Sequence, residues 1–316
     1  MAEWQIETGI GETRAILVER GEAIAARLDW PGSLAAGQVE DAILIARPSG
    51  SRRGTARFAN GEEALVDQLP PQASEGAAIR LKVLRAAMAE AGRLKRAQAR
   101  PTSDPPCPAP GAAGRNVARL PTGLWEEIWL QAWHGTADFA GGTLTITPTP
   151  AMTVIDIDGD LPAPALALAA VPVLARAIRQ LDLAGSIAID FPTLADKADR
   201  QAVDAALAAA LGGWPHERTA MNGFGLVQLV ARLERPSLLH RLAADRAGAA
   251  ARMLLRRAEQ VAGPGAELLL TAHPALRRAV KGEWEADLAR RTGRTIRWHE
   301  DAGLALESGF AQALQT

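Results

Sequence analysis

Hydrophobic and polar residues alternate along the first hundred positions in a pattern that predicts short strands. Residues 10–30 alternate on both sides of Glu19-Arg-Gly-Glu22, which supplies a turn and so indicates a β-hairpin. Further short alternating or apolar runs, with glycines at turn positions between them, occupy residues 37–46, 54–59, 63–67 and 78–84. Strands of this length and spacing predict a small closed barrel of the oligonucleotide-binding (OB) type over residues 37–97.

A stretch rich in proline and glycine, residues 98–114, is expected to be a linker, because such a composition does not form a regular element. The helix expected after it carries Trp125, Trp129 and Trp133 on one face. A row of this kind can pack in a core or stack nucleic-acid bases. Core packing is favoured, because aromatic stripes on helices are usually buried.

Two apolar runs in the second half of the chain end in aspartate. The first, residues 145–160, contains Asp156 and Asp158, and the second, residues 185–191, contains Asp190. Residues 166–183 between them have the composition of a helix, so the segment predicts a right-handed βαβ unit with parallel strands. The carboxyl ends of parallel strands point the same way, and Asp156 and Asp190 are therefore expected at one edge of a sheet.

Asp158 lies two residues after Asp156 on an extended segment, so both side chains should project from the same face. Three carboxylates at one place repel each other unless a cation neutralises them, and oxygen ligands suit Mg²⁺ or Mn²⁺. An aspartate at the end of a strand can also cap a helix or begin a turn, and for Asp190 this alternative stays open. Asp160, which precedes Leu-Pro, is expected in a loop.

Helix and strand patterns alternate downstream, which predicts an α/β sheet that continues to about residue 311. Helices are expected at residues 199–211, 238–262 and 273–291, and strands at residues 223–233, 267–271 and 295–299.

Composition narrows the function classes. The chain has 316 residues, 48% hydrophobic and 22% charged, as in ordinary folded proteins. No apolar run approaches a membrane span and the first residues do not resemble a signal peptide, so a cytoplasmic location is expected. The single cysteine, Cys107, excludes an internal disulfide and a cysteine-based zinc site. A net charge of −1 argues against non-specific coating of nucleic acid, although arginines cluster locally, as between residues 52 and 100.

Three blocks in chain order resemble the ribonuclease E/G family. They are Gly141-Gly-Thr-Leu-Thr…Thr-Val-Ile-Asp156-Ile-Asp158, Arg179-Gln-Leu…Ile-Ala-Ile-Asp190-Phe191, and Gly223-Phe-Gly-Leu…Arg-Leu-Glu-Arg-Pro-Ser-Leu238. The resemblance implies an endoribonuclease that cuts single-stranded RNA with a magnesium (or manganese) ion held by Asp156 and Asp190. Asp158 stands where the family has an asparagine that helps to position the metal and the water.

The resemblance also implies an α/β, multi-part fold in which an OB-type barrel is inserted into an RNase H-like and DNase I-like catalytic region. The RNase H-like part would comprise residues 1–36 and 115–143, and the DNase I-like part residues 144–311. Expected RNA contacts are Arg52, Arg53, Arg57, Phe58 and Lys82 on the barrel, with Arg232 and Arg235 as donors to phosphate oxygens. Phe58 would replace the family's stacking aromatics, which correspond to Arg57 and a position near Leu65.

The chain also departs from the family pattern. The cysteine pair that links family subunits through zinc is absent after Pro236-Ser-Leu238, so no zinc and no zinc-linked dimer are expected, and the oligomeric state is open. The proline linker replaces most of the family's sensor for the RNA 5′ end. A catalytically weak or inactive RNA-binding member is therefore an alternative. An unrelated α/β enzyme that uses Asp-x-Asp in nucleotide-sugar chemistry would require the three matching blocks to be a coincidence.

Overall fold

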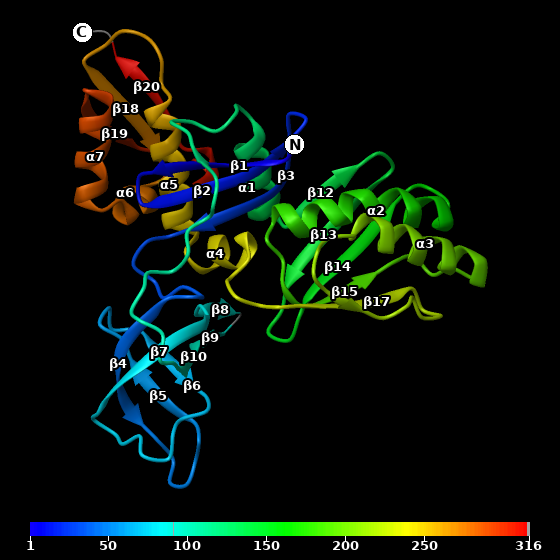
Figure 1. Ribbon diagram of the computed structural model, residues 1–316. Helices are drawn as coiled ribbons and strands as arrows, with labels where there is room; N and C mark the ends of the chain where they lie inside the picture. Colours follow the sequence, from blue (N-terminus) through cyan, green and yellow to red (C-terminus); the bar gives the residue numbers. More distant parts are fainter. Residues whose placement is uncertain (91, 315–316) are drawn as a thin grey trace. The chain divides into compact units, whose positions relative to one another are not determined.

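The computed structural model (Figure 1) describes residues 1–90 and 92–314. By their internal contacts, its residues fall into two compact units. The larger unit contains residues 1–6, 15–27 and 32–240, and the smaller contains residues 7–14, 28–31 and 241–316. None of the described helices combines the length and the apolar character that crossing a membrane requires.

The N-terminal strands form a sheet in the order β11-β1-β2-β3. The predicted hairpin is confirmed as β2 (Glu12–Glu19) and β3 (Glu22–Asp29), joined by Arg20 and Gly21, which both have positive φ as tight hairpin turns require. The strand before it, β1 (Glu3–Gly9), was not predicted. The short strand β11 (Arg115–Asn116) pairs in parallel with β1, which brings the chain back to the N-terminal strands after the barrel.

The predicted small barrel is confirmed as a closed barrel in the order β10-β6-β5-β4-β7. Its predicted strands are β4 (Val39–Ala46), β5 (Gly54–Arg57), β6 (Glu63–Val66) and β7 (Ala78–Arg85), and β8 (Met88–Glu90) and β9 (Arg93–Lys95) form an added hairpin. Closure comes from β10 (Ala97–Pro101), of which all but Ala97 lies in the range 98–114 that was expected to be linker. Ala97 and Ala99 are fully buried between polar neighbours, and this alternation of small residues gave only a weak strand signal.

The strands that carry the aspartates belong to a central sheet in the order β12-β13-β14-β15-β17-β16. Its members are β12 (Thr136–Phe139), β13 (Gly142–Pro148), β14 (Thr153–Gly159), β15 (Gly185–Asp190), β16 (Glu217–Arg218) and β17 (Leu226–Ala231). The run 145–160 is therefore not one strand. Pro148 and Pro150 interrupt it, and its two halves pair as the antiparallel hairpin β13–β14.

The expected helices next to the central sheet are present. The crossover helix α2 (Ala163–Gln180) contacts β12, β13 and β14, and α3 (Lys197–Ala210) packs against α2. In α1 (Leu124–His134), Trp125, Trp129 and Trp133 are all buried, and the rings of Trp129 and Trp133 stack with centroids 4.7 Å apart. The core interpretation of the tryptophan row is confirmed, and base stacking by these rings is excluded.

The C-terminal elements form a separate sheet in the order β19-β18-β20, so the prediction of one sheet that continues to residue 311 is wrong. Its strands are β18 (Glu267–Ala272), β19 (Thr295–Glu300) and β20 (Phe310–Leu314), the last of them not predicted. The helix expected at 238–262 is split into α4 (Leu238–Ala244) and α5 (Arg246–Glu259), because the Asp245 carboxylate accepts from the Gly248 N–H and starts a new helix. The helix expected at 273–291 is split into α6 (Pro274–Ala279) and α7 (Gly282–Thr292), because Val280 and Lys281 are extended.

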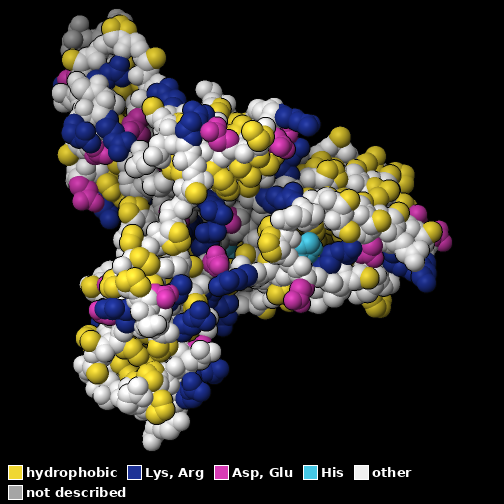
Figure 2. Space-filling model, viewed as in Figure 1, with side chains coloured by type: hydrophobic (Ala, Val, Ile, Leu, Met, Phe, Trp, Pro, Cys, Tyr) yellow, Lys and Arg dark blue, Asp and Glu magenta, His cyan; other side chains and the backbone are white. Residues whose placement is uncertain are grey.

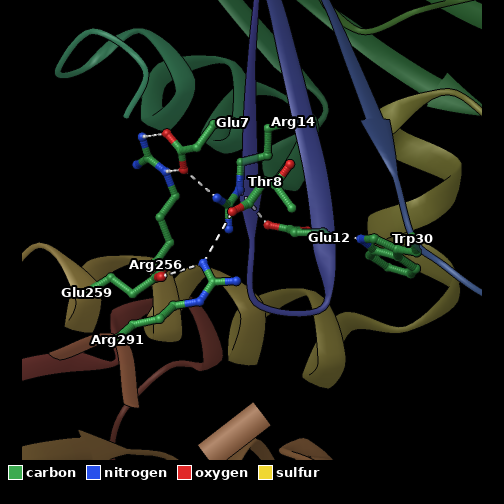
Figure 3. A network of polar contacts seen from close by, with 8 residues as sticks. All are labelled: Glu7, Thr8, Glu12, Arg14, Trp30, Arg256, Glu259 and Arg291. Carbon is green, nitrogen blue, oxygen red and sulfur yellow. Dashed lines mark hydrogen bonds and ion pairs between the residues drawn. The ribbon is translucent and has the colours of Figure 1, made fainter. Parts of the chain in front are cut away.

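The smaller unit is held together by a buried ion network (Figure 3). Glu7 Oε1 accepts from Arg256 Nε at 2.9 Å and also contacts Arg14 Nη1, and all three side chains are almost completely buried. Arg14 Nε donates at 2.7 Å to Glu12, whose other carboxylate oxygen accepts from the Trp30 indole at 3.0 Å. Charges buried this deeply are tolerated because each has a partner, so removal of one partner leaves an expensive unpaired charge.

Candidate active site on the central sheet

Asp156 and Asp190 lie side by side on neighbouring strands. Strands β14 and β15 run parallel, and their register pairs Asp156 directly with Asp190. Residues paired across neighbouring strands are about 4.8 Å apart in the hydrogen-bonding direction. The predicted convergence of these two aspartates at the carboxyl ends of parallel strands is confirmed.

The three aspartates share the solvent-exposed face of the sheet. Ile155, Ile157 and Ile189 are buried, whereas Asp156, Asp158 and Asp190 are exposed. The residues paired with Asp156 and Asp158 on β13 are Thr145 and Thr143, both short and polar. No bulky side chain of β13 therefore screens the carboxylates from a ligand.

The helix-cap alternative for Asp190 is excluded, and Asp160 lies where it was expected. Asp190 ends β15 but does not cap the next helix, because α3 begins at Lys197 and Asp196 occupies its N-cap position. Asp160 lies in a bend after β14, as expected for a loop residue.

A pocket of about 420 Å³ opens beside the carboxylates. It is lined by the aspartates and by the segments that follow β14 and β15, namely Asp156–Gly159, Leu161, Ala163, Leu166 and Asp190–Thr193. Glycine is required next to it, since a Cβ on Gly159 would lie 2.1 Å from the Gly141 carbonyl oxygen, and one on Gly225, which has φ +89°, would lie 2.3 Å from that of Phe191. These glycines let the backbones that frame the pocket approach closely.

The electrostatics of the pocket favour a cation. Desolvation by the surrounding protein, and then the charge of Asp158, raise the pKa of the Asp156 carboxyl, and Asp190 adds to the effect. One hydrogen bond opposes this rise in pKa, because the Ile157 N–H donates to Asp156 Oδ1 at 3.0 Å. A divalent cation between the carboxylates would relieve the repulsion, and an all-oxygen donor set fits Mg²⁺ or Mn²⁺.

Across the described residues, no group of three or more histidine, cysteine, aspartate or glutamate side chains has the arrangement of a preformed metal site. The fit of a metal ion therefore rests on Asp156 and Asp190, with water and substrate oxygens left to complete the shell. Magnesium sites of this kind commonly use one or two carboxylates and keep several waters.

The amino end of α2 contributes partial positive charge beside the carboxylates. Ala163, its first residue, lines the pocket, and the helix has no side-chain cap. Uncapped N–H groups at the start of a long helix attract anions, phosphate oxygens among them.

An exposed aromatic ring lies at the same edge of the sheet and was not singled out from the sequence. Leu226 on β17 pairs with Asp190, so the residues just before Leu226 lie at the aspartate end of the sheet. In this loop the Asn222 side-chain oxygen accepts from the N–H groups of Phe224 and Leu226, at 2.9 and 3.1 Å. The Phe224 side chain is 82% exposed. Glycines on both sides of a phenylalanine are the signal that could have indicated a loop presenting this ring.

One predicted RNA contact on the barrel is wrong. Phe58 is 3% exposed and packs with the barrel core, because it follows Gly54 and Ala56 on the inward-facing side of β5. It has no free face for a base.

The predicted basic residues of the barrel are on its surface, and most are paired. Arg53 bonds Asp67 at 3.0 Å, Arg57 bonds Glu63 at 2.9 Å and Lys82 bonds Asp104 at 3.2 Å, while Arg52 is exposed. Figure 2 shows lysine and arginine side chains gathered along one side of the barrel. Surface pairs of this kind are weak and exchange readily with a phosphate, so RNA binding by these residues stays a prediction.

Arg232 and Arg235 are not brought to the aspartates. They follow Ala231, which pairs with Gly185 at the start of β15, whereas Asp190 ends that strand. They therefore lie at the opposite edge of the sheet, on the order of 17 Å away at about 3.3 Å per residue. The prediction that they hold the phosphate at the aspartate site is wrong.

Comparison with protein families identifies this part of the chain. Residues 126–232, from α1 to the end of β17, match the model of the Ribonuclease E/G family. This segment is of the ribonuclease E/G type. The matched segment contains Asp156, Asp158 and Asp190 and the sheet that aligns them. The match over these residues suggests ribonuclease activity and an RNA substrate. No curated protein matches the chain.

Proposed function

We propose that this chain, through the segment that matches the ribonuclease E/G family, is a metal-dependent endoribonuclease that cleaves single-stranded RNA. The observation that carries the proposal is the direct pairing of Asp156 with Asp190 on parallel strands, within the segment that matches the family. Asp156 and Asp190 would hold a Mg²⁺ or Mn²⁺ ion. When bound, the ion would supply Lewis-acid activation of a water and of the scissile phosphate.

The other residues of the pocket support hydrolysis of a phosphodiester. The Asp158 carboxylate projects from the same face as Asp156 and can accept a proton from the attacking water, which forms a new P–O bond while the bond to the leaving oxygen breaks. The amino end of α2 can bind a phosphate oxygen. Phe224 offers a ring on which one base can stack.

The barrel is proposed as a second, weaker contact with single-stranded RNA. Arg52, Arg53, Arg57 and Lys82 would exchange their surface ion pairs for phosphate oxygens, so binding should weaken steeply as salt rises. Since Phe58 is buried, this contact would be mainly ionic. The division of the remainder into RNase H-like and DNase I-like parts belongs to the same proposal.

Cleavage of an end-labelled single-stranded RNA tests the function. We expect products with Mg²⁺ or Mn²⁺, none with EDTA, and loss of at least a thousandfold in rate for Asp156→Asn and Asp190→Asn. Asp160→Asn is the matched control, because this exposed neighbour does not line the pocket and should leave the rate unchanged. RNA binding without cleavage at any divalent cation would instead identify a non-catalytic RNA-binding member of the family.

A further inference from the structure

A second cavity lies at the opposite edge of the central sheet. It has a volume of about 520 Å³, and all of its lining residues belong to the larger unit. Gly185 and Ala231 pair at this edge, so the cavity is separated from Asp190 by the length of β15. Its volume is in the range of small-molecule and cofactor sites. It cannot receive the phosphate that Asp156 and Asp190 would cleave.

Positive charge dominates the lining. Arg27, Arg179, Arg232 and Arg235 contribute four guanidinium groups, against the carboxylates of Asp182 and Glu234. Arg235 bonds Asp182 at 2.8 Å, and Arg179 donates to the carbonyl oxygens of Ala210 and Gly212, both at 3.1 Å, so these two arginines are fixed in place.

The other two arginines are available to an anion. Arg232 reaches Glu234 at 3.2 Å through a side chain that is 78% exposed, and such a pair is easily exchanged. Arg27 lies over the Trp4 ring, 4.8 Å from its centroid, and no described carboxylate forms an ion pair with it. A phosphate can therefore bind Arg27 and Arg232 without breaking a buried ion pair.

Two tryptophans add aromatic surface to the same cavity. Trp4 and Trp214 are half-buried lining residues. Trp214 is held by a stack on His216, with centroids 5.0 Å apart, and Trp4 is held by Arg27. Indole faces fixed beside guanidinium groups are the combination that binds an aromatic base and its phosphate together.

We propose that this cavity binds one nucleotide, with its phosphate at Arg27 and Arg232 and its base against the indole of Trp214, since the Trp4 ring is already covered by Arg27. The nucleotide can be a free mononucleotide or one unit of an RNA strand. The proposal does not depend on cleavage at the aspartates.

Calorimetric titration of the full chain with AMP, in EDTA, tests the proposal. We expect saturable one-site binding, at least tenfold weaker binding of adenosine and of inorganic phosphate, and unchanged AMP binding in Asp156→Asn. Arg27→Gln and Trp214→Leu should each weaken AMP binding at least tenfold, whereas Trp214→Phe should preserve it. Arg176→Gln is the matched control, an exposed arginine on α2 outside the cavity. Circular dichroism and melting temperature report whether each variant folds.

Competition separates the two sources of the nucleotide. A short RNA that displaces AMP, and that loses affinity with Arg27→Gln, would show that the cavity holds part of a strand, and AMP binding without displacement would show a free nucleotide site. Absence of AMP binding would overturn the proposal. So would equal affinity for AMP and inorganic phosphate, or equal losses in Arg27→Gln and Arg176→Gln.

Discussion

Phe224 gives a quantitative test of how RNA approaches the aspartates. Its ring projects from the loop that precedes β17, at the end of the sheet where Asp190 pairs with Leu226. Asn222 fixes the loop backbone on both sides of the ring, so little order has to be gained when a base binds. We predict that Phe224→Ala weakens binding of single-stranded RNA while the carboxylates stay intact.

The expected magnitude follows from the exposed area. A phenylalanine side chain presents roughly 200 Å², and 82% of this one is exposed. A base that covers one face would remove about 80 Å² from water, which at about 25 cal/mol per Å² is worth about 2 kcal/mol. This agrees with the 1–3 kcal/mol per base found for aromatic stacking. A loss of about 2 kcal/mol corresponds to about 30-fold weaker binding.

Fluorescence anisotropy with a labelled single-stranded RNA, in EDTA, measures the affinity without cleavage. Phe224→Trp should bind as well as the parent chain, and Phe224→Leu should recover only part of the loss. Phe310→Ala, at an exposed phenylalanine in the smaller unit, is the matched control. An affinity of Phe224→Ala within twofold of the parent chain would refute the reasoning, and a loss equal to that of Phe310→Ala would show that the effect is not local.

Three further predictions concern stability. Arg256→Met leaves the buried Glu7 carboxylate without one of its partners and should lower the free energy of unfolding, measured with denaturant, by about 3–5 kcal/mol. The control Arg278→Met, at an exposed arginine of α6, should lower it by less than about 0.5 kcal/mol. Equal losses in the two variants would contradict the role of the network. The pKa of Asp156 is raised, so the folded state binds this proton more tightly than the unfolded state does, and the free energy of unfolding falls as pH rises through that pKa. In EDTA, Asp156→Asn should therefore melt at a higher temperature than the parent chain at pH 7 and at the same temperature near pH 3. A lower melting temperature of Asp156→Asn at pH 7 would contradict this prediction. Burial lowers the pKa of His240, whose Nδ1 lies 2.7 Å from Ser237 Oγ. The neutral ring therefore stabilises the fold above the usual histidine pKa of about 6.5, and this contribution is lost as pH falls below it. The melting temperature should fall between pH 8 and pH 5, and His240→Gln should make this fall smaller.

The sequence predicts best where one face of a strand is buried. Isoleucines alternate with aspartates at 155–158, and a helix of suitable length precedes the next strand, so the amino-acid pattern alone is sufficient to predict the parallel pairing of Asp156 and Asp190. The barrel follows equally from short alternating strands. Its closing strand was not predicted, because Ala97 and Ala99 pack by being small and carry little hydrophobic signal.

The predictions of RNA contacts failed where the direction of a strand, or the face of the strand on which a residue lies, determines which site its side chain can reach. Arg232 and Arg235 belong to a matching motif, but β17 runs antiparallel to β15 and carries them to the opposite edge from Asp190. Phe58 has the right residue type for stacking, yet the two-residue period of β5 turns its side chain into the barrel. The C-terminal helices were predicted too long, because a single capping residue such as Asp245 can restart a helix without a change in composition.

The central claim is that Asp156 and Asp190 share one divalent cation, and a crystal soaked in Mn²⁺ tests it most directly. We predict one anomalous difference peak between the two carboxylates, within coordination distance of an oxygen of each, with waters completing the shell. The peak should disappear in Asp190→Asn and persist in Asp160→Asn. Manganese bound elsewhere on the chain, with none between Asp156 and Asp190 at saturating concentration, would contradict the account.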